Sequence, residues 1–266
     1  ANQVNVANGA GSITLSLPQA IASTSTPTFG GMSLNGGLTG TTATFSGAVA
    51  APRLDVSTTA GGVSNPNVIL GTGAMPGVQS GAGNNLVLGY QAMYSNTTGY
   101  SNVASGAGAM YRNTQGYRNT AVGVLSLYNN TTGTDNVAIG VSTLSSNTSG
   151  ANNVAVGQNS LLNNTTGYAN VATGGLSLLQ NTTGIRNVAS GGAALYNNTT
   201  GYYNNALGYY SLYTNVTGNR NSALGAYADV TVDGLSYATA VGSSAKVSTS
   251  NTVVLGRTTD TTVIGA

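Results

Sequence analysis

The sequence predicts an all-β fold, a parallel β-roll or β-solenoid built from coils of 17 residues. Three observations predict it: Asn and Gly recur every 17 residues, each interval holds two short apolar runs bounded by Gly and Asn, and the period is too short for a pair of helices. We expect both apolar runs to be strands. Stacked coils would pair these strands in parallel, with a rise of about 4.8 Å per coil.

Four series of residues keep the 17-residue spacing without an insertion. With Asn85 as coil position 1, Gly occupies position 5, Asn position 12 and Gly position 15, and the copy from Asn153 to Ala169 (NVAVGQNSLLNNTTGYA) shows all four. We expect the two Gly of each coil to supply turns with positive φ.

Changes in composition divide the chain into four segments. Residues 1–60 contain three of the five Pro and both Phe but no 17-residue register, so we expect an extended, strand-rich shaft or docking segment there. Residues 61–84 are Gly-rich and lead into the roll. Residues 85–242 carry the regular repeat, and residues 243–266 form the final coil and the exit.

Apolar residues on both faces of the first strand predict self-association. Position 3 is Ala in eight of nine coils and position 9 is Leu or Met in eight successive coils, so these rows are expected to face each other in a thin core. Positions 2 and 4, such as Val137 and Ile139, point the other way and are also apolar. Because a strand that is apolar on both faces is covered on both faces, we expect a homotrimer around a common axis. The opposite assignment, with positions 2 and 4 inside and Ala on the axis, also predicts an oligomer.

The composition argues against most catalytic and cofactor chemistry. Charged residues make up 5% of the chain, which has no His and no Cys, so we expect no enzyme, no metal site and no cofactor. A net charge of +2 is too small for a surface that tracks phosphates. No apolar run approaches the roughly 18 residues of a membrane helix. Nucleic-acid binding and membrane insertion are therefore not expected.

The Asn-Thr-Thr-Gly turn admits three interpretations. Seven of its Asn residues head a glycosylation sequon, although glycans on every coil would crowd at about 5 Å. Its Thr rows match the pattern of ice-binding solenoids, but Gln115 and Val216 interrupt them. We favour a structural role, in which identical Asn side chains form a hydrogen-bonded ladder between coils. The residues of this turn ladder are Asn96, Asn113, Asn130, Asn147, Asn164, Asn181, Asn198 and Asn215.

Tyrosine is the better candidate for recognition, since there are 15 Tyr and two Phe. A Tyr ring offers a flat apolar face and a hydroxyl, which suit sugars and protein surfaces. The alternative is that stacked Tyr only stabilise the solenoid. The candidates for surface recognition, all at position 10, are Tyr94, Tyr111, Tyr128, Tyr196 and Tyr213.

The few charged residues of the repeat region have simple structural interpretations. Arg118, Arg186 and Arg220 share position 17 and are expected to be solvated edge charges that deter aggregation. Asp229 and Asp233 form the sequence DVTVD, which is weak evidence for a cation site because a third ligand is missing. We expect a loop insertion there.

Several short sequences resemble a known family. NVAIG (Asn136–Gly140), SALG (Ser222–Gly225) and the closing NTVVLG are similar to the head repeats of trimeric autotransporter adhesins, and similar repeats occur in bacteriophage tail fibres. The resemblance implies a left-handed parallel β-roll that trimerises and projects from a surface. Ile13–Gly36 resembles phage fibre shafts, and Val253–Gly265 resembles segments that precede a self-cleaving chaperone. The 17-residue period is longer than the usual adhesin-head repeat.

These observations predict a non-enzymatic structural or adhesive fibre, located outside the cell on a bacterial or virion surface. Its expected partners are further copies of itself and a host surface or glycan receptor bound through repeated side-chain rows. Two alternatives stay open. One is the self-polymerising subunit of an extracellular filament, with its N-terminal segment docking onto the next subunit. The other is a carbohydrate-active tailspike, whose acidic pair would be Asp229 and Asp233.

Overall fold

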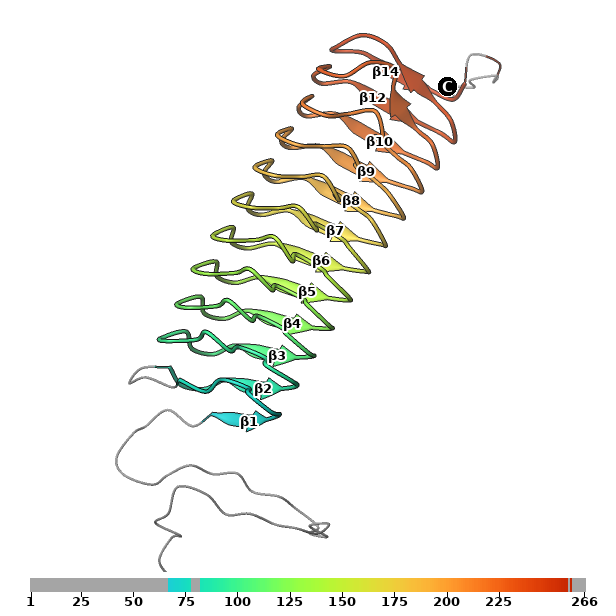
Figure 1. Cartoon of the computed structure of the whole chain (residues 1–266). Helices are drawn as coiled ribbons and strands as arrows, with labels where there is room; N and C mark the ends of the chain where they lie inside the picture. The colour runs from blue at the N-terminus through green and yellow to red at the C-terminus, as the bar shows by residue number, and fades with distance from the viewer. Residues whose placement is uncertain (1–66, 78–81, 258, 260–266) are drawn as a thin grey trace, which may run out of the picture. The chain divides into compact units, whose positions relative to one another are not determined.

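The computed structural model describes residues 67–77, 82–257 and 259, which belong to one compact unit spanning residues 53–266. These residues form an all-β parallel solenoid, and no helix occurs among them. Coil follows coil along a single direction, and each contributes one strand to the main sheet (Figure 1). The predicted all-β solenoid of 17-residue coils is therefore confirmed. The shaft predicted for residues 1–60 lies outside the described residues, as do residues 260–266 of the exit.

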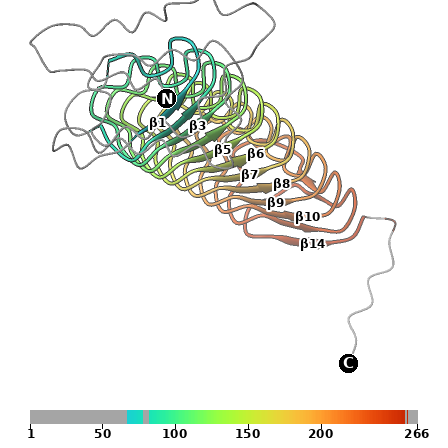
Figure 2. The same cartoon turned by 90° about the horizontal axis from the view of Figure 1, so that it is seen from below.

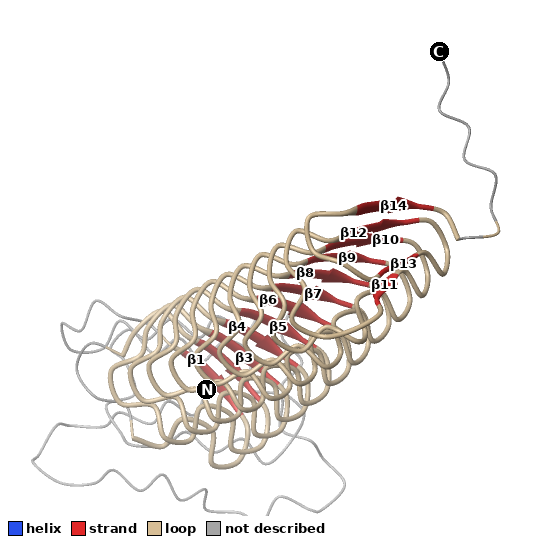
Figure 3. Cartoon of the chain, turned by 90° about the horizontal axis from the view of Figure 1, so that it is seen from above, coloured by secondary structure: helices blue, strands red, loops and turns tan. Residues whose placement is uncertain are grey.

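Within the described residues, twelve three-residue strands form one parallel sheet, in the order β1-β2-β3-β4-β5-β6-β7-β8-β9-β10-β12-β14. Two further strands of two residues, β11 and β13, pair with each other and lie apart from the row of twelve in Figure 3. The strands are β1 (Val68–Leu70), β2 (Leu86–Leu88), β3 (Val103–Ser105), β4 (Thr120–Val122), β5 (Val137–Ile139), β6 (Val154–Val156), β7 (Val171–Thr173), β8 (Val188–Ser190), β9 (Asn205–Leu207), β10 (Ser222–Leu224), β11 (Asp229–Val230), β12 (Thr239–Val241), β13 (Lys246–Val247) and β14 (Val253–Leu255).

The strands pair in register, so each coil position forms a column of like residues along the solenoid. Val137 of β5 is opposite Val154 of β6, and Ala138 is opposite Ala155. Viewed along the stack, successive coils follow one another as similar rings (Figure 2). A ligand or partner that contacts one coil therefore meets nearly the same surface on the next.

The core is a thin double column. The Ala side chains at position 3 and the Leu or Met side chains at position 9 are buried and belong to one apolar cluster that runs from coil to coil. Position 4 faces outward, as shown by Ile139, which is 41% exposed. The assignment of positions 3 and 9 to the inside is confirmed, and the opposite assignment is wrong.

The second apolar run of each regular coil is not a strand, which corrects the prediction of two strands per coil. Its core residue has a left-handed backbone, for example φ 50° at Leu161, and position 7 is left-handed too, with φ 56° at Asn159. The run still bonds to its neighbours, because the amide of Leu161 donates to the carbonyl of Ser177 at 3.0 Å. Extended geometry returns only near the end of the solenoid, in β11 and β13.

The two Gly of each coil have different roles, so the expectation of positive φ holds at only one of them. Position 5 has positive φ, such as 128° at Gly157. Position 15 does not, and Gly is needed there for space: a Cβ on Gly150 would overlap the amide oxygen of Asn147 and the carbonyl oxygen of Gly167 in the next coil. The turn at position 15 thus depends on a close backbone approach between coils.

Candidate functional site

Two columns of Asn side chains run through the interior, one at position 12 and one at position 1. In the turn ladder, the amide group of Asn113 donates to Oδ1 of Asn96 in the preceding coil at 2.8 Å. At position 1, Oδ1 of Asn102 accepts from both the backbone and the side-chain amide of Asn119, at 3.0 and 3.2 Å. Analysis of the sequence missed this second ladder, although Asn at position 1 recurs as regularly as Asn at position 12.

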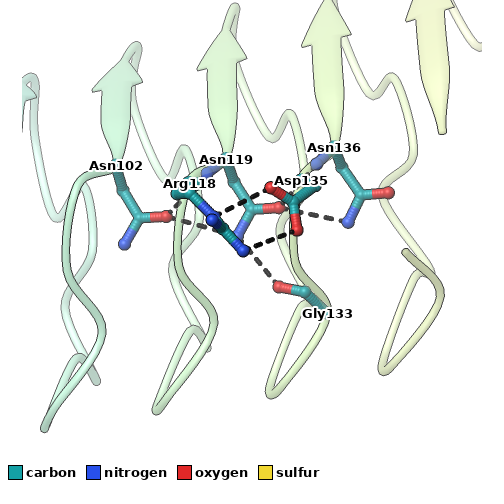
Figure 4. A network of polar contacts seen from close by, with 6 residues as sticks. All are labelled: Asn102, Arg118, Asn119, Gly133, Asp135 and Asn136. Atoms are coloured by element: carbon teal, nitrogen blue, oxygen red, sulfur yellow. Dashed lines mark hydrogen bonds and ion pairs between the residues drawn. The ribbon is translucent and has the colours of Figure 1, made fainter. Parts of the chain in front are cut away.

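The two ladders converge on the carbonyl oxygen of the Gly at position 15. The amide groups of Asn119 and Asn130 both donate to Gly133, at 2.9 and 3.0 Å. Figure 4 shows Asn102, Asn119 and Asn136 in line, with Gly133 below Asn119. Each buried amide therefore serves as both donor and acceptor, which satisfies it without water.

The turn ladder is closed to modification in the folded solenoid. Its Asn residues are at most 1% exposed, and their side-chain amide nitrogens all donate hydrogen bonds. A glycan attached to such a nitrogen would displace these bonds and would have no space. The structure therefore assigns the sequon Asn residues to the interior.

The position 10 Tyr side chains lie on the surface and form two separate stacks. Tyr94 stacks on Tyr111, and Tyr111 on Tyr128, each with 5.1 Å between ring centroids. Tyr196 stacks on Tyr213 at 5.4 Å. The five candidate Tyr residues are thus brought together in a group of three and a group of two, separated by coils that carry Ser or Leu at this position.

A shallow hollow lies beside the group of three. Gly108 has no side chain, so a space opens there that Tyr90, Tyr111, Tyr128 and Leu125 line. Tyr90 is 58% exposed. The hollow combines flat aromatic surface with phenol hydroxyls, which is the chemistry that sugar-binding surfaces use.

The outer face of the twelve-stranded sheet is the second candidate surface. It is formed by the side chains at positions 2 and 4, and large apolar residues are exposed along much of its length. Leu207 and Leu224 line a depression over β9, β10 and β12. The exposed members of this outer sheet face include Val122, Ile139, Val154, Val188, Leu207 and Leu224.

Asp229 and Asp233 lie where the turn stack ends, not in a loop insertion, which corrects that prediction. The 17-residue register continues through them, since Ser222 pairs with Thr239, and Asp229 belongs to β11. Asp229 is buried, accepts from the hydroxyl of Thr214 at 2.8 Å and lies 3.4 Å from Lys246 Nζ.

The side chain of Asp233 accepts hydrogen bonds that a backbone carbonyl accepts in the regular turns. In regular coils the amides at positions 13 to 15 donate to a backbone carbonyl of the next coil, whereas the amides of Val216 and Thr217 donate to Oδ1 of Asp233, at 2.7 and 2.8 Å. Partial burial raises the pKa of this carboxyl, but the hydrogen bonds from Thr217 and Val216 outweigh it and hold the pKa below its usual value. Both Asp residues thus cap the end of the turn stack.

The Arg residues at position 17 are arranged in two ways. Arg118 pairs with Asp135 in the next coil, with 2.9 Å between Nε and Oδ1 (Figure 4). Arg118 also lies over the ring of Tyr117, with Cζ 4.8 Å from its centroid. Arg186 and Arg220 contact Tyr rings without a carboxylate partner, with Cζ 5.3 and 5.5 Å from the centroid of Tyr203. Within the described residues, neither of these two has a carboxylate within 4.0 Å.

No family model, curated protein or solved structure matches the chain. In the described part of the chain, no helix is long and apolar enough to cross a membrane. The same residues contain no group of three Asp, Glu, His or Cys side chains placed to hold a metal ion. Function therefore has to be argued from the surfaces of the solenoid.

Proposed function

We propose that the chain is a non-enzymatic, adhesive fibre protein that forms homotrimers and acts outside the cell, on a bacterial or virion surface. The observation that carries the proposal is the outer sheet face. A stripe of exposed Val, Ile and Leu recurs from coil to coil along a sheet whose other face is already buried. Extended exposed apolar patches mark interaction sites.

A parallel trimer would bury this stripe against the same stripe of two other chains. Three rolls that run in the same direction place like coils at the same height, so position 4 of one chain meets the equivalent positions of the other two. Each outer sheet face then packs against two others around a closed axis, as symmetric oligomers do. The inward sheets bury the apolar columns, and the Tyr stacks remain available to a ligand.

The Tyr rows support adhesion. Tyr94, Tyr111 and Tyr128 stack nearly parallel to one another at the spacing of the coils, next to the hollow at Gly108. Repetition of a weak site along a rod raises avidity without any new contact, which is the usual advantage of a repetitive adhesin. We infer that the ligand is a repetitive surface glycan.

The tailspike alternative finds no support in the acidic pair. Asp229 is buried against Lys246, and the oxygens of Asp233 accept from Val216 and Thr217. A glycosidase needs one carboxylic acid that gives up its proton and a second carboxylate that faces the sugar. These two carboxylates instead satisfy the end of the turn stack.

The test measures the mass of the assembly and its binding to glycans. Light scattering of the purified chain should give three times the protomer mass of 26.3 kDa. On a glycan array, we expect the triple variant Tyr94→Ala, Tyr111→Ala, Tyr128→Ala to lose binding while its mass stays trimeric. A matched change, Tyr100→Ala with Tyr117→Ala, removes a different stacked pair and should retain binding. A monomeric wild type, or an unaffected triple variant, would overturn the proposal.

A further inference from the structure

Position 17 forms a column of alternating Arg and Tyr over four successive coils near the C-terminal end. We call these residues, Arg186, Tyr203, Arg220 and Tyr237, the Arg–Tyr edge. All four are exposed and have left-handed backbones with φ of 55–56°. Each backbone amide donates to position 16 of the preceding coil at 2.9–3.1 Å, which fixes the column in place.

The guanidinium groups of this edge are held by aromatic rings. Arg186 lies over Tyr203 and donates a hydrogen bond to its hydroxyl. Arg220 lies between three rings, with Cζ 5.4 Å from Tyr202, 5.5 Å from Tyr203 and 5.3 Å from Tyr237. Cation–π contacts orient a guanidinium without neutralising its charge. Both Arg side chains are therefore positioned and still able to bind an anion.

Comparison with Arg118 shows that not every Arg at position 17 carries an uncompensated charge. Arg118 occupies the same coil position but pairs with Asp135. The other acidic side chains of the described repeats are occupied elsewhere, Asp229 by Lys246 and Asp233 by backbone amides. The column at position 17 thus changes from the neutral pair of Arg118 and Asp135 in the earlier coils to two uncompensated cations in the Arg–Tyr edge.

We propose that the Arg–Tyr edge binds an acidic polysaccharide, one whose carboxylate or sulfate groups recur along the chain. Arg186 and Arg220 are two coils apart, or about 10 Å at the usual spacing of parallel strands. An Arg fork binds a carboxylate or sulfate through two parallel hydrogen bonds. Tyr203, which is 43% exposed, lies between the two forks. Its ring contacts both guanidinium groups, and its hydroxyl, which accepts from Arg186, can donate to the sugar between the acidic groups.

The chemistry favours a sugar acid over a nucleic acid. A nucleic acid carries a charge on every phosphate and needs a matching run of cations, whereas this edge provides two cations separated by an aromatic residue, on a chain with a net charge of +2. The inference rests on the proposed function as a glycan-binding fibre and deepens it by naming the ligand class.

The test uses the full chain in its native assembly and three immobilised polymers: polygalacturonate for carboxylates, dextran sulfate for sulfates and dextran as the neutral form. The test variant is Arg186→Gln with Arg220→Gln. The control, Arg112→Gln with Arg118→Gln, changes the net charge by the same amount at other positions. At low ionic strength, we expect the test variant to lose at least about tenfold in affinity for one or both acidic polymers, and the control to change less than about twofold. The polymer for which the affinity falls shows whether the edge binds carboxylate or sulfate groups.

Three outcomes would overturn the inference: equal losses in the test and control variants, equal competition by single-stranded DNA, or a change in the mass of the assembly in the test variant. The last would assign the edge to a subunit interface. A trimeric wild type that binds a neutral glycan through Tyr94, Tyr111 and Tyr128 but no acidic polymer would refute this inference and leave the proposed function intact. A monomeric wild type that binds polygalacturonate through Arg186 and Arg220 would refute the proposed trimeric fibre and leave this inference intact.

Discussion

Asn136 and Asn153 occupy the same position in adjacent coils, and Oδ1 of Asn136 accepts from the backbone amide and the side-chain amide of Asn153, at 3.0 and 3.1 Å. The same amide group donates to the carbonyl of Gly167 at 2.9 Å. One side chain thus joins two coils and closes the turn of its own coil. Repeated through the stack, this pair explains why a polar residue forms much of the interior.

Substitution of Asn153 by Ala should destabilise the solenoid strongly. It removes four side-chain hydrogen bonds and leaves the backbone amide of Asn170 without its partner. The oxygen of Asn136 keeps its bond from the backbone amide of residue 153, and the carbonyl of Gly167 keeps its bond from Asn164. Each lost bond contributes about 1 kcal/mol and an unsatisfied buried group costs about 1–3 kcal/mol, so we expect a loss of about 3 kcal/mol or more in the free energy of unfolding, measured by denaturant titration. Thr132→Ala, on an exposed turn two coils earlier, serves as the control. A cost for Asn153→Ala no larger than that of the control would refute the ladder as a source of stability.

The close approach at coil position 15 makes a second prediction. Gly150→Ala places a Cβ against Asn147 and the backbone of Gly167, neither of which can move without disturbing its own coil. We expect a loss of about 1–3 kcal/mol or more, as for other overpacked sites. Gly175→Ala is the matched control, since its nearest atom is the carbonyl oxygen of Gln158 at 3.8 Å. Thermal melts that fail to separate the two variants would contradict the close-approach role.

The carboxylate cap makes stability depend on acid. Because the pKa of Asp233 is lowered in the folded state, its contribution is present above the ordinary Asp pKa of about 3.9 and is lost as the pH falls through the lowered value. We expect Asp233→Asn to melt below the wild type at neutral pH and to converge with it in strong acid. The melting temperatures of both proteins across this range test the prediction. A difference independent of pH would show that the charge contributes nothing.

An arginine on the outer sheet face should disrupt the proposed trimer. Ile139→Arg adds a charge at a position that is 41% exposed in one roll and would be buried between three, where an unpaired charge is costly. We expect a monomer that retains the β circular dichroism spectrum. Ile139→Thr copies the residue found at the equivalent position Thr173 and should remain trimeric. If Ile139→Arg sediments as a trimer, the outer sheet face does not form the interface.

Much of the fold could be predicted because its columns are visible as periodic residues. The period specified the stacking, and the alternation of Ala with larger residues assigned the core face correctly. The left-handed backbone at Leu161 could not be predicted, because a branched side chain rarely adopts positive φ. Its cost is offset in the stack, where Leu161 is fully buried and its amide bonds to Ser177.

The candidate surfaces were partly predictable for a related reason. Position 10 could be placed outside by alternation, and the breaks in its Tyr column are visible in the sequence. The hollow at Gly108 depends on side chains of neighbouring coils and could not be predicted. The paired Arg118 and the aromatic-bound Arg220 occupy the same coil position, so their difference arises from the residue one coil away. Residues that are 17 positions apart in the sequence lie side by side in adjacent coils. Such contacts can therefore be predicted once the period is known.

Electron microscopy of the purified chain offers the decisive view of the assembly. Averaged cross-sections should show three rolls around one axis, with the twelve-stranded sheets facing inward and the Tyr94–Tyr111–Tyr128 stack facing outward. A single thin roll, or three rolls whose sheets face solvent, would contradict the proposal that the outer sheet face holds the fibre together.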